Sequence, residues 1–541
     1  MRVCLVGVPT ANEFDDHSMG EADALRTIAE HAPLGVLSLA AVLEERGLRP
    51  EVVDLNRLYY DFQHTNGRRE DDFSRFAASY FRERKFDFVG FGSVCSSYPV
   101  TVRIACEVKR QLPDSVVAFG GPQASAVDVA TLNAYAPIDM VLRGETEETL
   151  PQLLQALDQG RQLDEVPGLT FRRDGTVLRT PDAPGITDLD SLPFPAFHLL
   201  PDMETCRFMP LELGRGCPFA CTFCSTNDFF RRRFRLKSPA RMLADMRRVK
   251  ANYGIDTFEL VHDMFTVDRK RVAAFCEALL AAPDKFHWGC SARTDCIDEE
   301  LIELMASAGC GGVFFGIETG SARMQKIIDK GLDLTDSAAC VRSCDKSKIK
   351  TAVSLIVGFP EETREDLRST VAFFMNSLLY DHADPQLVIL APLAGTPIHR
   401  QHKEHLYLED ADSDMSYRGW DQGPEERAMI AEHPDIFPNF YSVLTPHLDH
   451  EFVKELRDFL LNGIRTARRL LKDLRLAGAD MLDVFEDWRV WRQRCKGAFI
   501  GNERVAYYAS DSFPHDLLKF IEAQYLSGAK PAAVEVASRV S

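Results

Sequence analysis

Three cysteines lie close together in the segment GRGCPFACTFCS, residues 214–225. Cys217, Cys221 and Cys224 follow a C-x3-C-x2-C spacing, which brings three thiolates to one short loop. Three thiolates can bind zinc or an iron–sulfur cluster. Structural zinc takes four ligands, so an upstream residue, Cys206, could complete a four-cysteine zinc site. A [4Fe-4S] cluster normally takes four cysteines, and one held by three would leave an iron open for another molecule.

The motif and its surroundings, RGCPFACTFCS, resemble the radical S-adenosylmethionine enzymes, whose C-x3-C-x2-C signature follows the first strand of a barrel. The resemblance implies a [4Fe-4S] cluster on Cys217, Cys221 and Cys224, with S-adenosylmethionine bound to the open iron through its amino and carboxylate groups. An electron from the cluster would cleave the sulfonium and release a 5′-deoxyadenosyl radical. The cofactor carries this chemistry, and the protein orients and shields it.

Four later residues stand where this family binds S-adenosylmethionine. CSARTD contains Ser291 and Arg293 at the end of the third barrel strand, and the planar fork of an arginine suits a carboxylate. Glu318 in FGIETGS corresponds to an acid that meets the ribose. Gly358 in SLIVGFPEET resembles the adenine-side strand, where glycine permits a close approach. Arg293 or Glu318 alone would equally fit a surface ion pair, but their order along the chain favours cofactor binding.

The α/β pattern that precedes the cysteines resembles the cobalamin-binding subgroup of the same superfamily. The resemblance rests on PLGVLSLAAVLEERGLRPEVVDLN, FVGFGSVCSSYPVT, AFGGPQAS and VLRGETEETL. In such a fold, ligands bind outside the carboxyl ends of the parallel strands, so the loops there would surround the corrin. The residues implied for cobalamin are Ser93, Ser96, Tyr98, Gly120, Gly121, Pro122, Gln123, Arg143, Gly144 and Glu145.

Asp15, His17 and Gly20 form a literal D-x-H-x-x-G arrangement within DDHSMG. In many cobalamin proteins this histidine replaces the cofactor's own base on cobalt, and a helix begins directly after the glycine. Here the best helix start, PLGVLSL, comes thirteen residues after Gly20. Many members of the radical subgroup also lack the histidine. We therefore leave His17 out of the cobalamin site and interpret it first as a polar loop residue.

An alternation of strands and helices must position these residues. The buried-strand patterns RVCLVGV, RPEVVDL, FDFVGFGSV, SVVAFGG and DMVLRG alternate with helical ones, which predicts a doubly wound parallel sheet. A second series, MPLELG, TFELVHD, FHWGCSA, GGVFFGIE, KTAVSLIVGF and PQLVILAP, predicts a partial (β/α)6 barrel. We predict a cobalamin-binding-like domain over 1–160, a linker over 161–205, the radical barrel over 206–400 and a mostly helical accessory domain over 401–541.

Composition limits the partners and the location of the protein. The net charge of −18 argues against nucleic acid as the main partner. No apolar run reaches the ~18 residues of a membrane span, and the N-terminus lacks a signal-peptide pattern, so a cytoplasmic location is the default expectation. The fourteen cysteines are then expected to stay reduced. The basic run RRRFRLK, residues 231–237, is either a solvated surface turn or a site of anion contacts beside the cysteines.

With both cofactors bound, the resemblance implies methylation of an unactivated carbon of a secondary-metabolite-like small molecule. The deoxyadenosyl radical would remove a hydrogen atom, and the substrate radical would take a methyl group from methylcobalamin. A second S-adenosylmethionine would remethylate the cobalt, and a flavodoxin or ferredoxin would supply electrons. Two alternatives stay open: a radical enzyme that catalyses a non-methylating rearrangement, cyclisation or oxidation, and a non-catalytic iron–sulfur or corrinoid sensor. The signatures at the later strand ends argue against the sensor, which needs no carboxylate clamp.

Overall fold

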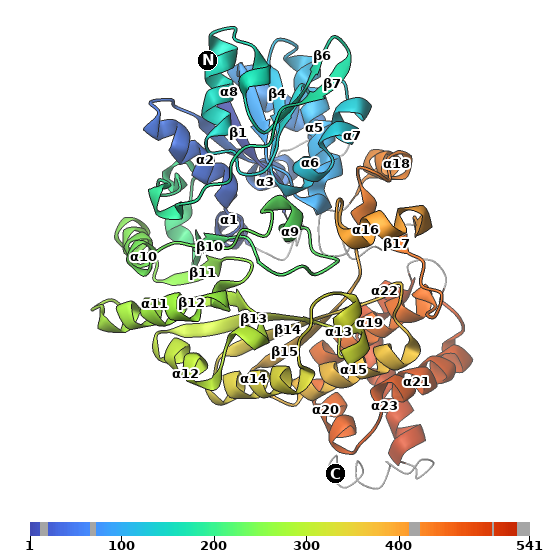
Figure 1. Ribbon diagram of the computed structural model, residues 1–541. Coiled ribbons are helices and arrows are strands. Elements are labelled where there is room, and N and C mark those ends of the chain that lie inside the picture. Colours follow the sequence, from blue (N-terminus) through green and yellow to red (C-terminus); the bar gives the residue numbers. More distant parts are fainter. Residues whose placement is uncertain (11–19, 65–71, 410–421, 500–502, 527–541) are drawn as a thin grey trace. The chain divides into compact units, whose positions relative to one another are not determined.

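The computed structural model describes residues 1–10, 20–64, 72–409, 422–499 and 503–526 (Figure 1). The chain divides into two compact units. Unit 1 contains Met1–Ser291 and Ala391–Ser442, and unit 2 contains Ala292–Leu390 and Val443–Ser541. These units follow the density of contacts in the folded chain. The boundaries near residues 160, 205 and 400 follow sequence pattern and stay a prediction.

A seven-stranded sheet forms the first part of unit 1, in the order β2-β1-β3-β4-β5-β6-β7. The first five strands pair in parallel, and β6 and β7 add an antiparallel hairpin. The hairpin turns at Asp174 and Gly175, which both have positive φ, as an Asp-Gly pair predicts. The strands are β1 (Val3–Gly7), β2 (Glu51–Asp54), β3 (Phe88–Phe91), β4 (Val116–Phe119), β5 (Met140–Leu142), β6 (Leu169–Arg173) and β7 (Thr176–Arg179).

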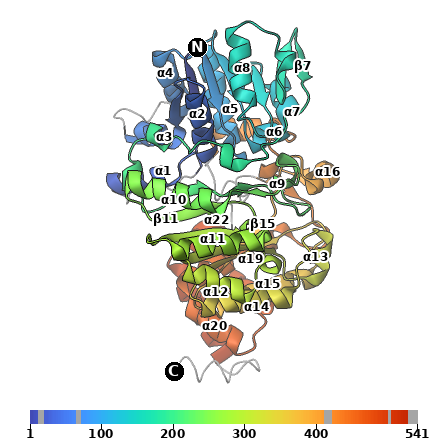
Figure 2. The ribbon, with the colours of Figure 1, turned by 60° about the vertical axis from the view of Figure 1, so that its left-hand side comes forward.

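Alternate side chains of these strands enter two separate cores, one on each face of the sheet. Val89 and Phe91 of β3 enter the first core, whereas Phe88 enters the second. Burial on both faces explains why the strands read as continuous apolar runs. The first core is covered by α3 (Leu55–His64), α4 (Phe73–Arg84), α5 (Tyr98–Gln111), α6 (Pro122–Ala126) and α7 (Asp128–Ala134), and the second by α2 (Leu34–Glu45) and α8 (Thr149–Asp158) (Figure 2).

One helix of this part differs from the expectation. Helix α1 (Glu21–Glu30) begins directly after Gly20, whereas we expected the first helix at PLGVLSL, which is α2. The buried face of α1 offers only one large apolar side chain, Ile28, besides Ala24 and Ala29, so its sequence pattern is weak. The helix that cobalamin proteins place after this glycine is therefore present. Asp15 and His17 lie outside the described residues, and the role of His17 stays a prediction.

Six further parallel strands follow the predicted barrel pattern, three in each unit. In unit 1, β11 pairs with β8 and β12, and in unit 2, β14 pairs with β13 and β15. The strands are β8 (Met209–Glu212), β11 (Thr257–Val261), β12 (His287–Ala292), β13 (Cys310–Glu318), β14 (Lys350–Val357) and β15 (Ala383–Ile389). The helices between them are α10 (Pro239–Tyr253), α11 (Arg269–Ala281), α12 (Glu299–Ser307), α13 (Ala322–Ile327), α14 (Leu334–Lys346) and α15 (Arg364–Leu378).

Local signals fix the ends of several of these helices. Ser238 caps α10 by accepting a hydrogen bond from the N–H of Arg241, and Gly254, with φ 74°, ends it. Thr363 and Asp366 form a capping box at the start of α15. Side-chain caps therefore mark the starts of α10 and α15, and a glycine with positive φ marks the end of α10.

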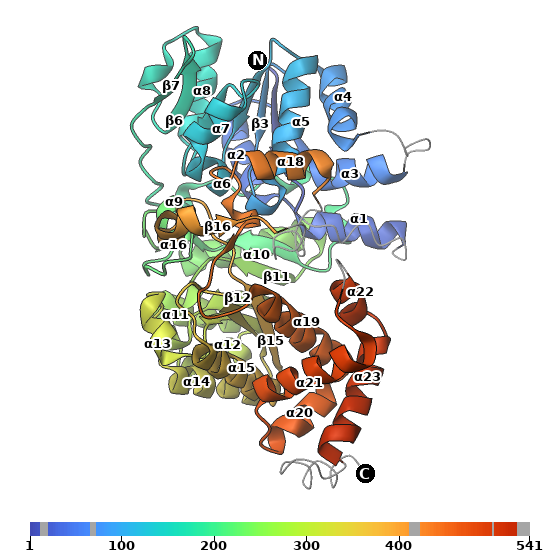
Figure 3. The same cartoon turned by 90° about the vertical axis from the view of Figure 1, so that its right-hand side faces the viewer.

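The described residues after 400 are mostly helical, as predicted for 401–541. In unit 1, α16 (Pro397–His402) precedes α18 (Pro424–Glu432), which packs against α5 and adds Ile430 to the first core (Figure 3). In unit 2, an aromatic core surrounds the fully buried Trp488. Its helices are α19 (His450–Thr466), α20 (Arg468–Leu476), α21 (Met481–Lys496), α22 (Glu503–Ala509) and α23 (Ser512–Ile521).

Among the described residues, no single helix has the length and apolar character that crossing a membrane requires. One bent pair, Glu21–Glu30 with Leu34–Glu45, meets the criterion by length and composition only. The second helix of this pair is α2, whose Leu37, Ala40 and Leu43 are fully buried in unit 1.

Candidate functional site

The three cysteines lie in a loop that a short hairpin closes. The hairpin consists of β9 (Gly214–Arg215) and β10 (Arg235–Leu236), which pair antiparallel. We call the residues between these strands, 216–234, the cysteine loop. Glycine is required at Gly216, because a Cβ atom there would lie 2.2 Å from the carbonyl oxygen of Arg233. The loop begins directly after the first barrel strand, where the sequence predicted it.

The three thiols lie close to one another. Cys217 and Cys221 are buried, and Cys224 is partly exposed. Burial raises the pKa of the Cys217 thiol to about 11, and the neighbouring Cys224 and Cys221 contribute to the same rise. Three thiols in mutual electrostatic contact form a suitable donor set for a cluster, because bound iron would stabilise all three thiolates.

A four-cysteine zinc site is not formed. Cys206 lies beside Glu30, and burial together with this carboxylate raises the pKa of its thiol to about 12. Within the described part of the chain, no three His, Cys, Asp or Glu side chains converge where a single metal ion could bind. A cluster differs from a single ion because each thiolate binds a different iron, so its ligands are further apart.

Polar side chains from the end of β11 and from the loop itself hold the cysteine loop in shape. Asp263 accepts a hydrogen bond from Thr226 Oγ1 at 3.1 Å and another from the N–H of Gly216. Burial raises the pKa of this carboxyl. Asn227 Nδ2 donates to the carbonyl oxygen of Cys221 at 3.3 Å. The strand pattern TFELVHD indicated this strand end, but the contact between Asp263 and the loop was not predicted.

Arg215 joins the cysteine loop to the segment that follows β5. Its guanidinium contacts Glu145 at 3.0 Å, Glu147 at 2.6 Å and Glu212 at 2.6 Å. Arg235 contacts Glu145 at 2.8 Å. Burial disfavours the charge of Arg215, but Glu147 and Glu212 outweigh it and raise the pKa of the guanidinium well above its usual value. Of this network, the sequence predicted only Glu145 as a site residue.

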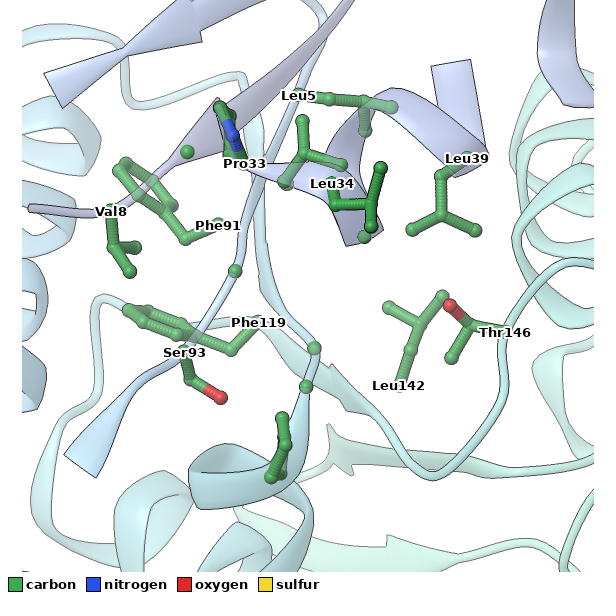
Figure 4. A pocket seen from close by; sticks show the side chains of 18 of the residues that line it. Leu5, Val8, Pro33, Leu34, Leu39, Phe91, Ser93, Phe119, Leu142 and Thr146 are labelled. Atoms are coloured by element: carbon green, nitrogen blue, oxygen red, sulfur yellow. The ribbon is translucent and has the colours of Figure 1, made fainter. Parts of the chain in front are cut away.

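A cavity of about 460 Å³ opens at the carboxyl edge of the first sheet (Figure 4). It lies at the ends of β1 and β3, where the strand order reverses, and such switch points are the usual ligand sites of doubly wound folds. Most of the side chains in it are apolar, including Val8, Leu39 and Phe119. Arg215 and Phe230 also line it, so the cavity adjoins the cysteine loop within unit 1.

Backbone forms part of the cavity wall. Gly121 has φ 94° and packs on Ser93, whose Oγ accepts a hydrogen bond from the N–H of Ala124 at 3.0 Å. A Cβ atom at Gly120 would make only an ordinary contact, 3.7 Å from the carbonyl oxygen of Leu142. An apolar cavity with exposed glycine backbone and few polar groups fits the flat parts of a large organic cofactor such as cobalamin.

The structure brings part of the predicted cobalamin set to this cavity. The members of this set that line the cavity are Ser93, Gly120, Gly121, Pro122, Gly144 and Glu145. The other predicted residues contact neighbouring structure instead. The Tyr98 hydroxyl hydrogen bonds to Thr131 at 3.0 Å, and Gln123 donates to the carbonyl of Ile436 at 2.9 Å. The carbonyl of Ser96 accepts from Gln422 at 3.0 Å, and Arg143 forms an ion pair with Asp182.

Two of the residues predicted to bind S-adenosylmethionine, Arg293 and Glu318, are connected in unit 2, whereas Ser291 lies in β12. Arg293 is buried, and its guanidinium contacts Asp295 at 2.8 Å and donates to the carbonyl of Lys330 at 2.8 Å. The ammonium group of Lys330 in turn contacts Glu318 at 2.9 Å. Glu318 has φ 68°, at a register shift of β13. Its carboxylate and the Arg293 fork therefore belong to one buried polar network.

Gly358 follows β14 with φ 86° and donates its N–H to Glu362 Oε2 at 2.6 Å. Glu362 is fully buried, and this burial raises the pKa of its carboxyl to about 8. The sequence analysis named Gly358 and missed Glu362. The segment GFPEET contains two adjacent glutamates, Glu361 and Glu362, and the sequence alone does not show which of them is buried.

Comparisons with known proteins match both parts of this site. A family model described as the radical SAM superfamily matches residues 211–374, and one described as the B12 binding domain matches residues 24–154. An uncharacterised methyltransferase of Pyrococcus horikoshii is 30% identical over 368 residues, which cover 67% of this chain and 77% of that protein.

Two further similarities differ in extent. An anaerobic magnesium-protoporphyrin IX monomethyl ester cyclase of Cereibacter sphaeroides is 28% identical over 310 residues, which cover 54% of this chain and 50% of that protein. The chain thus spans about half the length of this relative. The structure of TsrM from Kitasatospora setae, a radical S-adenosylmethionine methyltransferase, superposes with a TM-score of 0.62 at 21% identity, over 83% of this chain and 86% of that chain. At this identity the likeness shows a shared fold.

The chain therefore belongs to the radical S-adenosylmethionine enzymes that carry a B12-binding domain. Its cofactors are a [4Fe-4S] cluster, S-adenosylmethionine and cobalamin.

Proposed function

We propose that this enzyme transfers a methyl group to an unactivated carbon of a small, secondary-metabolite-like substrate. The observation that carries the proposal is the apolar cavity at the switch point of the B12-binding sheet, lined in part by the segment that bears the cysteines. A methyl donor and a radical source must act on the same substrate, and the contribution of the cysteine loop to the cavity lining supports neighbouring sites for the two. The Pyrococcus horikoshii relative, named as a methyltransferase, supports the same outcome.

When bound, the cluster supplies the electron that cleaves S-adenosylmethionine, and cobalamin carries the methyl group. Cys217, Cys221 and Cys224 hold the cluster, while Asp263 and Asn227 keep their loop in shape through the hydrogen bonds described above. Thiols in a loop of fixed shape are pre-organised for their irons.

Ser291, Arg293, Glu318 and Gly358 are the proposed ligands of S-adenosylmethionine. Arg293 must then share its guanidinium between the carboxylate of the cofactor and Asp295, which it contacts at 2.8 Å. Gly358 has no Cβ atom and a positive φ, so a side chain does not stand in the way of a close approach of the adenine.

We also infer the domain organisation over 1–160, 161–205, 206–400 and 401–541 that the sequence pattern indicates. A flavodoxin or ferredoxin is the proposed electron donor, and a cytoplasmic location, where cysteines stay reduced, is proposed with it.

A second candidate is a non-methylating radical reaction such as a ring closure. The relative from Cereibacter sphaeroides that is named as a cyclase favours it. The two candidates differ in their products. Methylation releases one 5′-deoxyadenosine and one S-adenosylhomocysteine for each methyl group transferred, whereas the cyclase reaction has no need of S-adenosylhomocysteine.

The test begins with the protein purified without oxygen, its cluster rebuilt and hydroxocobalamin added before desalting. We expect stoichiometric cobalamin and, with a reductant and methyl-deuterated S-adenosylmethionine, both 5′-deoxyadenosine and S-adenosylhomocysteine. Cys221→Ala is the matched control, which should lose 5′-deoxyadenosine but keep cobalamin because the cavity does not use this thiol. A protein with its cluster that makes 5′-deoxyadenosine but no S-adenosylhomocysteine would favour the second candidate. A protein with both cofactors that makes no 5′-deoxyadenosine would favour the sensor.

A further inference from the structure

Three consecutive arginines, Arg231, Arg232 and Arg233, project from the cysteine loop, and we call them the arginine turn. All three are exposed. Arg231 contacts Asp182 at 3.1 Å, whereas Arg232 and Arg233 form no ion pair with any described residue. Two of these three charges therefore take no part in ion pairs that stabilise the described fold.

The remaining cations of the run RRRFRLK behave differently. Arg235 is largely buried and contacts Glu145 at 2.8 Å, and the buried Lys237 contacts Asp245 at 3.1 Å. These two side chains fasten the hairpin that closes the loop. The run thus divides into a buried half that stabilises the site and an exposed half that does not.

The backbone of the arginine turn is held in an unfavourable conformation. Arg231 and Arg232 have φ of 52° and 56°, in the left-handed region that residues other than glycine rarely adopt. Such strain persists where the surroundings impose it, and it clusters at functional sites. Here the N–H of Arg232 donates to the carbonyl of Asn227 at 3.1 Å, and Asn227 also donates to the carbonyl of Cys221. The turn is a fixed projection from the scaffold that holds the cysteines.

Helix α16 adds further cations beside the cysteine loop. The N–H of Ile398 donates to the carbonyl of Thr222 at 3.0 Å, so α16 is bonded directly to the loop, and the views in Figures 1 and 3 agree that it lies next to α9 (Thr226–Phe229). The side chains of Arg400 and Lys403 are 59% and 64% exposed, each with one acidic neighbour, Asp228 and Glu404. The loop and α16 together present a basic surface in a chain whose net charge is −18.

We propose that the arginine turn, with Arg400 and Lys403, is the docking surface for an acidic one-electron donor protein that reduces the cluster. The proposal rests on the proposed function, since it requires a cluster that accepts electrons. One electron leaves the donor, which is oxidised by one unit, and enters the cluster, which is reduced by one unit. No atom or proton is transferred.

The charge of the chain explains both why the donor protein would be acidic and why it would bind at the arginine turn. An acidic donor is repelled by most of a chain with net charge −18, so a local basic surface decides where it binds and how it is oriented. A nucleic acid would require a wider array of cations than these few residues. Because the arginine turn is bonded to the scaffold of the cysteines, a protein seated on it would bring its redox group close to the cluster.

The experiment compares two reductants with the cofactor-loaded full chain. Formation of 5′-deoxyadenosine is measured with dithionite, a small reductant that needs no docking surface, and with a flavodoxin reduced by its reductase. The variants are the double charge reversal Arg232→Glu with Arg233→Glu, and the neutral double variant with glutamine at both positions. Arg161→Glu is the control, because Arg161 is an exposed arginine after α8 that lines neither the cavity nor the cysteine loop.

All variants should match the unmodified chain with dithionite. With flavodoxin, the charge reversal should raise the KM for the donor by about tenfold and the glutamine variant by less, while Arg161→Glu leaves it unchanged. The KM of the unmodified chain should also rise with salt, because exposed charges are screened beyond a Debye length of about 10 Å at 0.1 M. The charge-reversed chain should lose most of this salt dependence.

Three outcomes would overturn the docking surface. The first is an unchanged KM and salt dependence for flavodoxin in the charge-reversed chain. The second is an equal loss of activity with dithionite, which would mean that the arginines act inside the site. The third is an unmodified chain that works with dithionite but not with any acidic donor. Failure with both reductants would instead refute the proposed function, and the docking surface with it.

Discussion

Replacing Arg215 with methionine removes the cation that Glu145, Glu147 and Glu212 share, while keeping a long apolar side chain beside the cavity. Arg215 is 7% exposed, and its contacts to the three carboxylates are 2.6 to 3.0 Å long. Arg235 would still neutralise Glu145. The change therefore leaves Glu147 and Glu212 as acids without a partner in a largely buried position.

The magnitude follows from this burial. Removing one partner of a buried ion pair typically costs about 3–5 kcal/mol, which is a large part of the 5–15 kcal/mol that stabilises a typical folded domain. Arg215→Lys should cost less, since it keeps the charge, but an ammonium group cannot contact three carboxylates as a planar guanidinium does. Adding Glu147→Gln to Arg215→Met should restore part of the loss, because one unpaired charge disappears.

The assay is urea unfolding of the cofactor-free protein, followed by the iron, sulfide and cobalamin content after reconstitution. Arg110→Met is the matched control, because Arg110 contacts Glu107 at 2.6 Å in an exposed pair that should be worth less than about 1 kcal/mol. Arg215→Met should also lower the retention of both cofactors. The reasoning is refuted if Arg215→Met unfolds at the urea concentration of Arg110→Met, or if Glu147→Gln destabilises the Arg215→Met chain further.

Four other predictions concern single features of the site. Cys221→Ala should abolish the brown colour of the reconstituted protein, and iron and sulfide at the unmodified level would contradict the cluster. Gly120→Leu should fill part of the cavity and lower cobalamin retention with an unchanged iron content, because a Cβ atom is tolerated there at 3.7 Å from its nearest neighbour. His17→Ala should leave cobalamin affinity nearly intact, and a large loss measured by titration would make it a cobalt ligand. Burial raises the pKa of Glu362 to about 8, so the stability it contributes is fully present below its unfolded pKa and is lost as the pH rises to about 8. Unfolding at pH 6 and pH 9 should therefore show a loss of about 3 kcal/mol that Glu362→Gln abolishes, and an equal loss in that variant would contradict the raised pKa.

The strands were predictable because both large sheets consist mainly of parallel strands, and these strands carry strong apolar patterns. RVCLVGV corresponds to β1 (Val3–Gly7), and KTAVSLIVGF to β14 (Lys350–Val357). Helix α1 escaped prediction because Ile28 is the only large apolar side chain that it buries. Periodicity reports how much apolar surface an element buries, so a helix with a small buried face leaves little signal.

The cysteines were predictable for a different reason, since their spacing is local. The ion pairs that hold their loop are not local, because Glu145 and Arg215 are 70 residues apart. Nothing in the pattern of either segment indicates the other. The same limit explains why Ser93 and Gly120 were placed at the cavity while Tyr98 and Gln123 hold other parts of unit 1. A strand end can be recognised in a sequence, but the direction in which each side chain leaves it depends on packing.

The two proposed cofactor sites of unit 1 are lined by different kinds of residue, and the chemistry of the two cofactors explains the difference. A cluster needs thiols at fixed positions, so charged and polar contacts such as that between Asp263 and Thr226 hold the cysteine loop. A large organic cofactor needs a surface that costs little to desolvate, so apolar side chains and glycine backbone form the cavity. Cys221→Ala and Gly120→Leu should consequently each affect one cofactor. Arg215 lines the cavity and adjoins the cysteine loop, so among these variants only its replacement should lower the retention of both.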